Sequence, residues 1–109
     1  MIQDDYLMRK ITRAVEAIAR ALLGKGQDAE EQALEELDVV LADLLGPHRS
    51  MFDQLDATTM ARLLGSDELV RTVADTCDAE ATLLTRRGET RRATLRRRQA
   101  ENLRATLRE

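Results

Sequence analysis

The sequence of 109 residues lacks tryptophan and has one residue each of tyrosine, phenylalanine, proline, cysteine and histidine. Aromatic residues make up 2% of the chain, which argues against an all-β sandwich, because strands favour aromatic and β-branched side chains. One cysteine cannot form an internal disulfide, and this is typical of a reducing compartment. No apolar run approaches the roughly 18 residues of a membrane span, and Asp4 and Asp5 stand where a signal peptide would be basic. We therefore expect one cytoplasmic domain.

The residue patterns of common catalytic and metal sites are also missing. Because His48 is the only histidine, no site with two histidine ligands can form. Cys77 has no histidine nearby in the sequence to activate it, so we interpret it as a small buried hydrophobic residue. The segment Gly24-Lys25-Gly26 lacks the upstream glycine and the hydroxyl of a phosphate-binding loop. We expect no enzymatic activity, no cofactor and no bound metal.

The chain is rich in charge instead, with 34% charged residues and a formal net charge of −3. The two signs are segregated. Residues 86–109 contain nine arginines and three acids, whereas residues 27–45 contain seven acids and no base. Opposite charge blocks in one chain either pair with each other or recruit partners.

Apolar residues recur with a period near 3.6 along almost the whole chain, which predicts an all-α fold. The expected helices span residues 4–23, 28–45, 48–55, 57–64, 67–87 and 89–108. Long helices joined by short loops pack antiparallel. The chain should therefore form two helical hairpins, 4–45 and 67–108, joined by a bridge of short helices at 47–65.

Several residues are suited to the ends of these helices. Asp28, Asp56 and either Ser66 or Asp67 are expected N-caps. The tripeptide Leu-Leu-Gly occurs three times, and each glycine is expected to adopt the left-handed conformation that ends a helix. These glycines are Gly24, Gly46 and Gly65.

The apolar positions predict which side of each helix is buried. On helix 4–23 the expected core stripe is Leu7, Ile11, Val15, Ile18 and Leu22. Helix 67–87 has its main stripe at Val70, Val73, Cys77, Ala81 and Leu84, and a second, weakly polar face at Thr72, Thr76, Ala79 and Leu83. A helix that can be buried on two sides should lie in the centre of the fold or at a subunit contact.

The second hairpin resembles the tetratricopeptide repeat, a helical hairpin of 34 residues. The matching positions are Ala81, Leu84, Gly88, Ala93 and Ala100, whereas Arg97 stands where the repeat usually has an aromatic residue and Cys77 where it often has tryptophan. The first hairpin matches more loosely, at Ala19, Leu22 and Gly26, with two extra residues before Ala33.

The whole chain also resembles a small bacterial family of tetratricopeptide-like proteins of unknown function. The resemblance lies in Ile2, Asp5, Tyr6, Met8 and Arg9, in the acidic second helix and in the Leu-Leu-Gly before the bridge. It implies a tetratricopeptide-like fold and protein binding, with the first helix of each hairpin lining the concave face. It implies no catalytic residue.

The arginine-rich helix 89–108 has three interpretations. It is a solvated helix, it pairs with the acidic helix 28–45 of this or another copy, or it binds nucleic acid or anionic lipid. We predict a protein-interaction or self-association module, whose partner is another protein or a second copy in a homodimer, and no membrane. The alternative is a nucleic-acid-binding accessory protein that uses helix 89–108. The candidate partner-binding residues are Arg9, Arg13, Arg20, Arg91, Leu95 and Arg98.

Overall fold

The computed structural model describes residues 2–107, with side chains from residue 5 onward. It confirms the all-α class, and residues 2–107 contain no strand. The elements are α1 (Ile2–Leu23), α2 (Gln27–Leu45), the 3₁₀ helix η1 (Gly46–Met51), α3 (Ala57–Leu64), α4 (Asp67–Arg86) and α5 (Thr90–Ala105).

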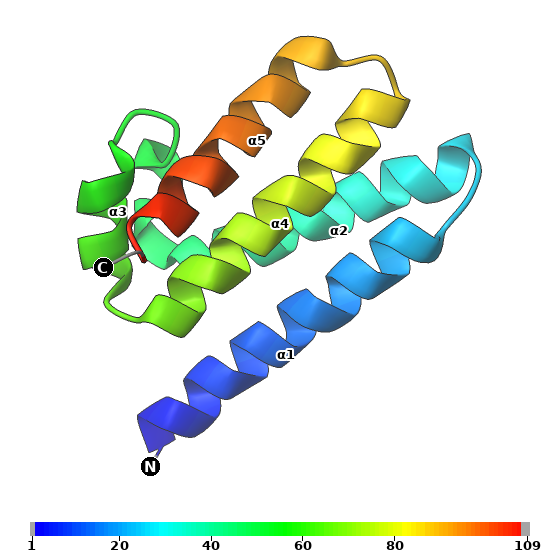
Figure 1. Ribbon diagram of the computed structural model, residues 1–109. Helices are drawn as coiled ribbons and strands as arrows, with labels where there is room; N and C mark the ends of the chain where they lie inside the picture. The colour runs from blue at the N-terminus through cyan, green and yellow to red at the C-terminus, as the bar shows by residue number, and fades with distance from the viewer. Residues whose placement is uncertain (1, 108–109) are drawn as a thin grey trace.

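Helix α4 lies at the centre of the fold, as its two apolar faces predict. In Figure 1 it runs between α1 and α5 with α2 behind it, and it contacts all three. Both predicted faces are buried, with Val73 and Cys77 on one and Thr76 and Leu83 on the other all at 0% exposure. The hydroxyl of Thr76 donates to the backbone oxygen of Thr72 at 2.8 Å, so this polar residue enters the core without an unpaired donor.

Helix α1 packs through a different face from the predicted one. The residues fully buried against the rest of the fold are Ala14, Ala17 and Ala21, whereas Val15 and Leu22 are exposed. The predicted stripe is therefore right for Leu7 and Ile18, which pack against the core, and wrong for Val15 and Leu22, because the helix is rotated toward its alanines. Alanine allows the backbone of α1 to approach α2 and α4 closely, and the larger side chains lie beside that contact rather than within it.

Two of the predicted N-caps are confirmed. Asp56 accepts from the backbone N–H of Thr59 at 3.1 Å, and Ser66 accepts from that of Leu69 at 3.3 Å. Asp28 is not a cap, because α2 begins one residue before it and Gly26 occupies the cap position.

The three Leu-Leu-Gly glycines differ from one another. Only Gly65 has the expected left-handed backbone, with φ 75° and ψ 2°. Gly46 has φ 56° but ψ −130°, and Gly24 has no positive φ because the turn is made at Gly26, with φ 99°.

The bridge is less helical than predicted. In place of a helix over 48–55, η1 ends at Met51 and turns lead to Leu55. Pro47 lies in the first turn of η1, where its missing N–H has no cost. The last helix ends at Ala105 with a turn at 106–107, and residue 108 of the predicted helix lies outside the described residues.

Candidate protein-binding groove

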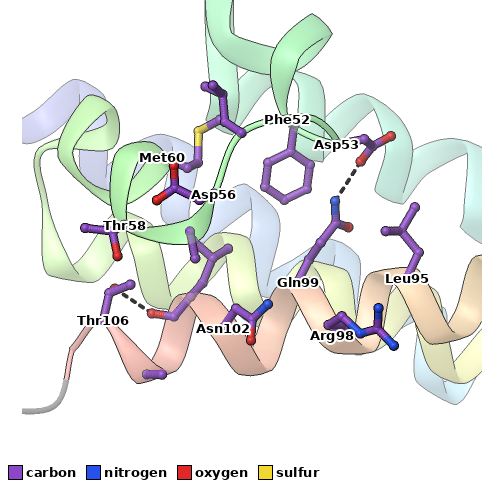
Figure 2. Close-up of a pocket in the computed structure, with 14 residues that line it drawn as sticks. Phe52, Asp53, Asp56, Thr58, Met60, Leu95, Arg98, Gln99, Asn102 and Thr106 are labelled. Atoms are coloured by element: carbon purple, nitrogen blue, oxygen red, sulfur yellow. Dashed lines mark hydrogen bonds between the residues drawn. The ribbon is translucent and has the colours of Figure 1, made fainter.

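A groove of about 490 Å³ lies between the bridge and α5, which we call the bridge groove. Phe52, Met60 and Leu103 form its apolar floor, and each is at most 4% exposed. Figure 2 shows Phe52 and Met60 reaching in from the bridge while Leu95, Gln99 and Asn102 face them from α5. The chain's only phenylalanine thus lines the bridge groove.

The rim of the bridge groove is polar on the α5 side. Leu95 and Arg98, both predicted partner-binding residues, line it together with Asn102. Leu95 is 41% exposed, and Arg98 is exposed and forms no ion pair with any residue from 5 to 107. An exposed aliphatic side chain therefore lies one turn from an unneutralised guanidinium, above an apolar floor.

Hydrogen bonds fix the wall of the groove that the bridge supplies. Asp53 Oδ1 accepts from Arg96 Nη1 at 2.8 Å and from Gln99 Nε2 at 2.7 Å, and the second of these bonds is drawn in Figure 2. The guanidinium of Arg96 also lies over the ring of Phe52, 5.7 Å from its centroid. Burial alone would raise the pKa of Asp53, but the hydrogen bonds from Gln99 and Arg96 outweigh it and hold that pKa below its usual value. The bridge is thereby attached to α5 across 43 residues of sequence.

Arg96 is also the counter-ion of a buried carboxylate. Glu80 on α4 is 2% exposed, and its Oε1 lies 3.2 Å from Arg96 Nε. Burial raises the pKa of Glu80, and the charge of Arg96 opposes the rise. The pKa of Arg96 itself is raised, because its partner Asp53 and the charge of Glu80 outweigh the effect of burial. One guanidinium thus joins α4, the bridge and α5.

Two other residues singled out in the sequence have simple surroundings. Cys77 is fully buried, as predicted, and burial raises the pKa of its thiol to about 12. His48 lies half-buried in η1.

No cluster of three or more potential metal ligands occurs in the part of the chain that the structure describes. None of the helices described there is both long and apolar enough to cross a bilayer.

The predicted partner-binding residues fall on two separate helices. Arg9 and Arg13 are exposed on α1, whereas Arg20 is engaged with Glu36 of α2 in an ion pair. On α5 the structure brings Leu95 and Arg98 together at the bridge groove. Arg91 is exposed one turn before Leu95 and does not line the groove.

The acidic helix α2 is paired within the molecule, but not with α5. Its carboxylates Glu36, Asp38 and Glu30 meet Arg20 of α1, Arg49 of η1 and Arg86 of α4. The α5 arginines pair elsewhere: Arg92 with Glu89, Arg96 with Glu80 and Asp53, and Arg104 with Asp75 and Asp78. Of the three interpretations of helix 89–108, its pairing with helix 28–45 of the same copy therefore does not occur among the described residues.

The sequence did not identify the bridge side of the groove. Phe52, Asp53 and Met60 were only part of a connecting segment, because their approach to α5 depends on contacts more than 40 residues away. The available signal was the single phenylalanine, an unusual residue in this chain, just before the capping residue Asp56.

Comparison of the chain with protein-family models, with curated proteins and with solved structures gives no match. The tetratricopeptide resemblance therefore stays a prediction. In the second hairpin Ala81, Leu84, Ala93 and Ala100 are buried, whereas Ala19 and Leu22 of the first hairpin are exposed.

Proposed function

We propose that this protein is a non-enzymatic interaction module that binds a protein partner in the bridge groove. The observation that carries this proposal is the concave apolar floor of Phe52, Met60 and Leu103 beneath the exposed pair Leu95 and Arg98. Concave apolar surfaces with a few polar groups at the rim are the usual form of a binding site.

The chemistry of the groove specifies the partner. The floor accepts an aliphatic or aromatic side chain, and Arg98 offers a planar guanidinium that binds a carboxylate through two hydrogen bonds. A peptide with a large apolar residue within one helical turn of Asp or Glu supplies both groups. We therefore expect an acidic, amphipathic segment as the ligand.

A selection from a displayed library of random peptides tests this proposal. The wild-type protein should enrich peptides that combine a large apolar residue with an acidic one. Their affinity should fall at least about tenfold in Arg98→Glu, the loss of a charge-assisted hydrogen-bonded pair. Arg97→Glu is the matched control, because Arg97 is also exposed on α5 but does not line the groove. Equal binding by wild type and Arg98→Glu would refute the proposal.

The same two variants address the nucleic-acid alternative. Of the six arginines within α5, Arg92, Arg96 and Arg104 already have carboxylate partners. Nucleic acid responds to the total positive charge of the helix more than to one side chain, so Arg97→Glu and Arg98→Glu should both weaken binding to a generic duplex and reduce its salt dependence. Loss of peptide binding in Arg98→Glu alone favours the protein partner.

A further inference from the structure

The outward side of α1 has an apolar row that its contacts within the molecule cover only in part, since Ile18 packs against the core while its neighbours along the row are more exposed. Met8, Val15 and Leu22 are 50%, 57% and 41% exposed, and Ile11 and Ile18 between them are half-buried. We call these five residues the α1 ridge. Helix α1 thus places alanine at the centre of its inner face and exposes Met8, Val15 and Leu22.

The spacing of the α1 ridge is that of a helix–helix seam. Its members follow one another at intervals of three, four, three and four residues, the pattern that keeps an apolar line facing a second helix. The exposed residues that flank it on the solvent side, Thr12 and Ala19, are small and uncharged, so another helix can approach closely. A solvated helix has no need of such a row.

A shallow groove of about 300 Å³ continues the α1 ridge toward α4. Val15, Ile18 and Leu22 form one wall, and the other consists of Asp75, Asp78 and Thr82 of α4 with Arg104 of α5, which pairs with both aspartates. Figure 1 shows α1 and α4 running in the same direction along this side of the molecule. The surface offered to a partner is therefore two parallel helices wide.

We propose that the α1 ridge and this groove face a second copy of the chain, related by a two-fold axis with the α1 helices antiparallel. An isologous contact of this kind is the commonest in homo-oligomers. The position of Arg71 on α4 agrees with the antiparallel direction. Arg71, exposed and without an ion pair among residues 5–107, then lies near Asp75 and Asp78 of the other copy, where it joins the guanidinium of Arg104 that already binds both carboxylates. In a parallel pair, like charges would face each other.

The ends of α1 agree with the same direction. The exposed Asp5 lies near the start of the helix and the exposed Lys25 just after its end, so an antiparallel pair brings each Asp5 near a Lys25 of the other copy. The α1 ridge is about 21 Å long at the usual helical rise. A footprint of that length and two helices in width is small among specific interfaces, so we expect a reversible dimer that forms at micromolar concentration.

Sedimentation velocity over a concentration series from about 10 to 500 μM, which spans a micromolar dissociation constant, tests the dimer. The wild-type mass should rise from 12.3 kDa toward twice that value. Val15→Glu places two carboxylates in the contact and should remain monomeric across the series. Val39→Glu is the matched control, because Val39 is 69% exposed on α2, away from the α1 ridge, and it should dimerise as wild type does.

Crosslinking tests the direction. In an antiparallel pair Thr12 of one copy lies near Ala19 of the other, so a mixture of Thr12→Cys and Ala19→Cys should form a mixed disulfide. The buried Cys77 should not compete. Disulfide-linked dimers of Thr12→Cys with itself, without the mixed disulfide, would indicate a parallel pair and overturn the antiparallel arrangement.

A wild-type protein that stays at 12.3 kDa, or equal dimerisation of Val15→Glu and Val39→Glu, would overturn the dimer itself. This inference does not depend on the bridge groove. Peptide binding there should survive Val15→Glu, and the dimer should survive Arg98→Glu, so the failure of either proposal can be recognised separately.

Discussion

Replacement of Arg96 by methionine should be among the most destabilising single substitutions in this protein. The side chain is 11% exposed and holds Glu80 at 3.2 Å and Asp53 at 2.8 Å. Glu80 Oε1 accepts no hydrogen bond from residues 5–107, so Arg96 is its one close compensating contact there. Removing one member of a buried ion pair costs about 3–5 kcal/mol, because the other charge stays buried without compensation. That is a large share of the roughly 5–15 kcal/mol that stabilises a small domain.

Urea unfolding followed by far-UV circular dichroism at pH 7 measures this loss. Arg104→Met is the matched control, because Arg104 also bonds two carboxylates, Asp75 and Asp78, but its side chain is 39% exposed. An exposed network of this kind contributes about 0–1 kcal/mol for each pair. The double variant Glu80→Met with Arg96→Met should be more stable than Arg96→Met alone, since the uncompensated carboxylate is then gone.

The deficit of Arg96→Met should depend on pH in a defined direction. Burial already raises the pKa of Glu80, and loss of Arg96 removes the largest opposing influence. A carboxyl group whose folded pKa is raised is stabilising when protonated, and this stability is lost as the pH rises through the folded pKa. The deficit should therefore be full at pH 7 and shrink as the pH falls toward the ordinary glutamate value of about 4.3. A deficit below about 1 kcal/mol, the size of an exposed pair, or one that does not change with pH would refute this reasoning.

Two further predictions concern the backbone and the core. Gly65→Ala should lower the free energy of unfolding by about 1–2 kcal/mol, because Gly65 has a left-handed backbone. Gly24→Ala should cost little, since Gly24 lacks a positive φ and an added methyl group would meet Ala29 Cβ at an ordinary 3.6 Å. Thermal unfolding of the two variants checks this, and equal losses of stability would contradict it. The Cys77 thiol, with its pKa raised to about 12, should not react with a thiol reagent at pH 8 until the protein unfolds. Rapid labelling of the native protein would contradict this, because it would show that the thiol is solvated. Since the folded pKa of Cys77 is raised, the stability of the protein should fall as the pH rises above the unfolded pKa of about 8.5.

Residue patterns within single helices were predicted well because they depend on local physics. The 3.6-residue period located α1, α2, α3, α4 and α5, and the caps Asp56 and Ser66 followed from their side-chain chemistry. The inward face of α1 was wrong because two neighbouring arcs of that helix are apolar, one of alanine and one of larger residues. Hydrophobicity alone favours the larger arc, whereas close packing against α2 and α4 selects alanine.

Only the α5 side of the candidate site was predicted from the sequence. Leu95 and Arg98 stand out on α5 because an aliphatic residue among arginines is visible in the sequence. Their neighbours across the bridge groove depend on which turn of α5 meets residues 52–60, and no local pattern encodes that register.

By itself the sequence determined the all-α class, the two buried faces of α4 and the segregation of charge, because periodicity and composition decide which segments are helical and which of them have two apolar sides. Only the tertiary structure decided that Arg96 pairs with a buried carboxylate, that the bridge and α5 enclose a groove, and that Val15 and Leu22 of α1 lie at the surface. Each of these depends on how one helix is rotated and aligned against another, and that choice is made by the packing of all the helices together.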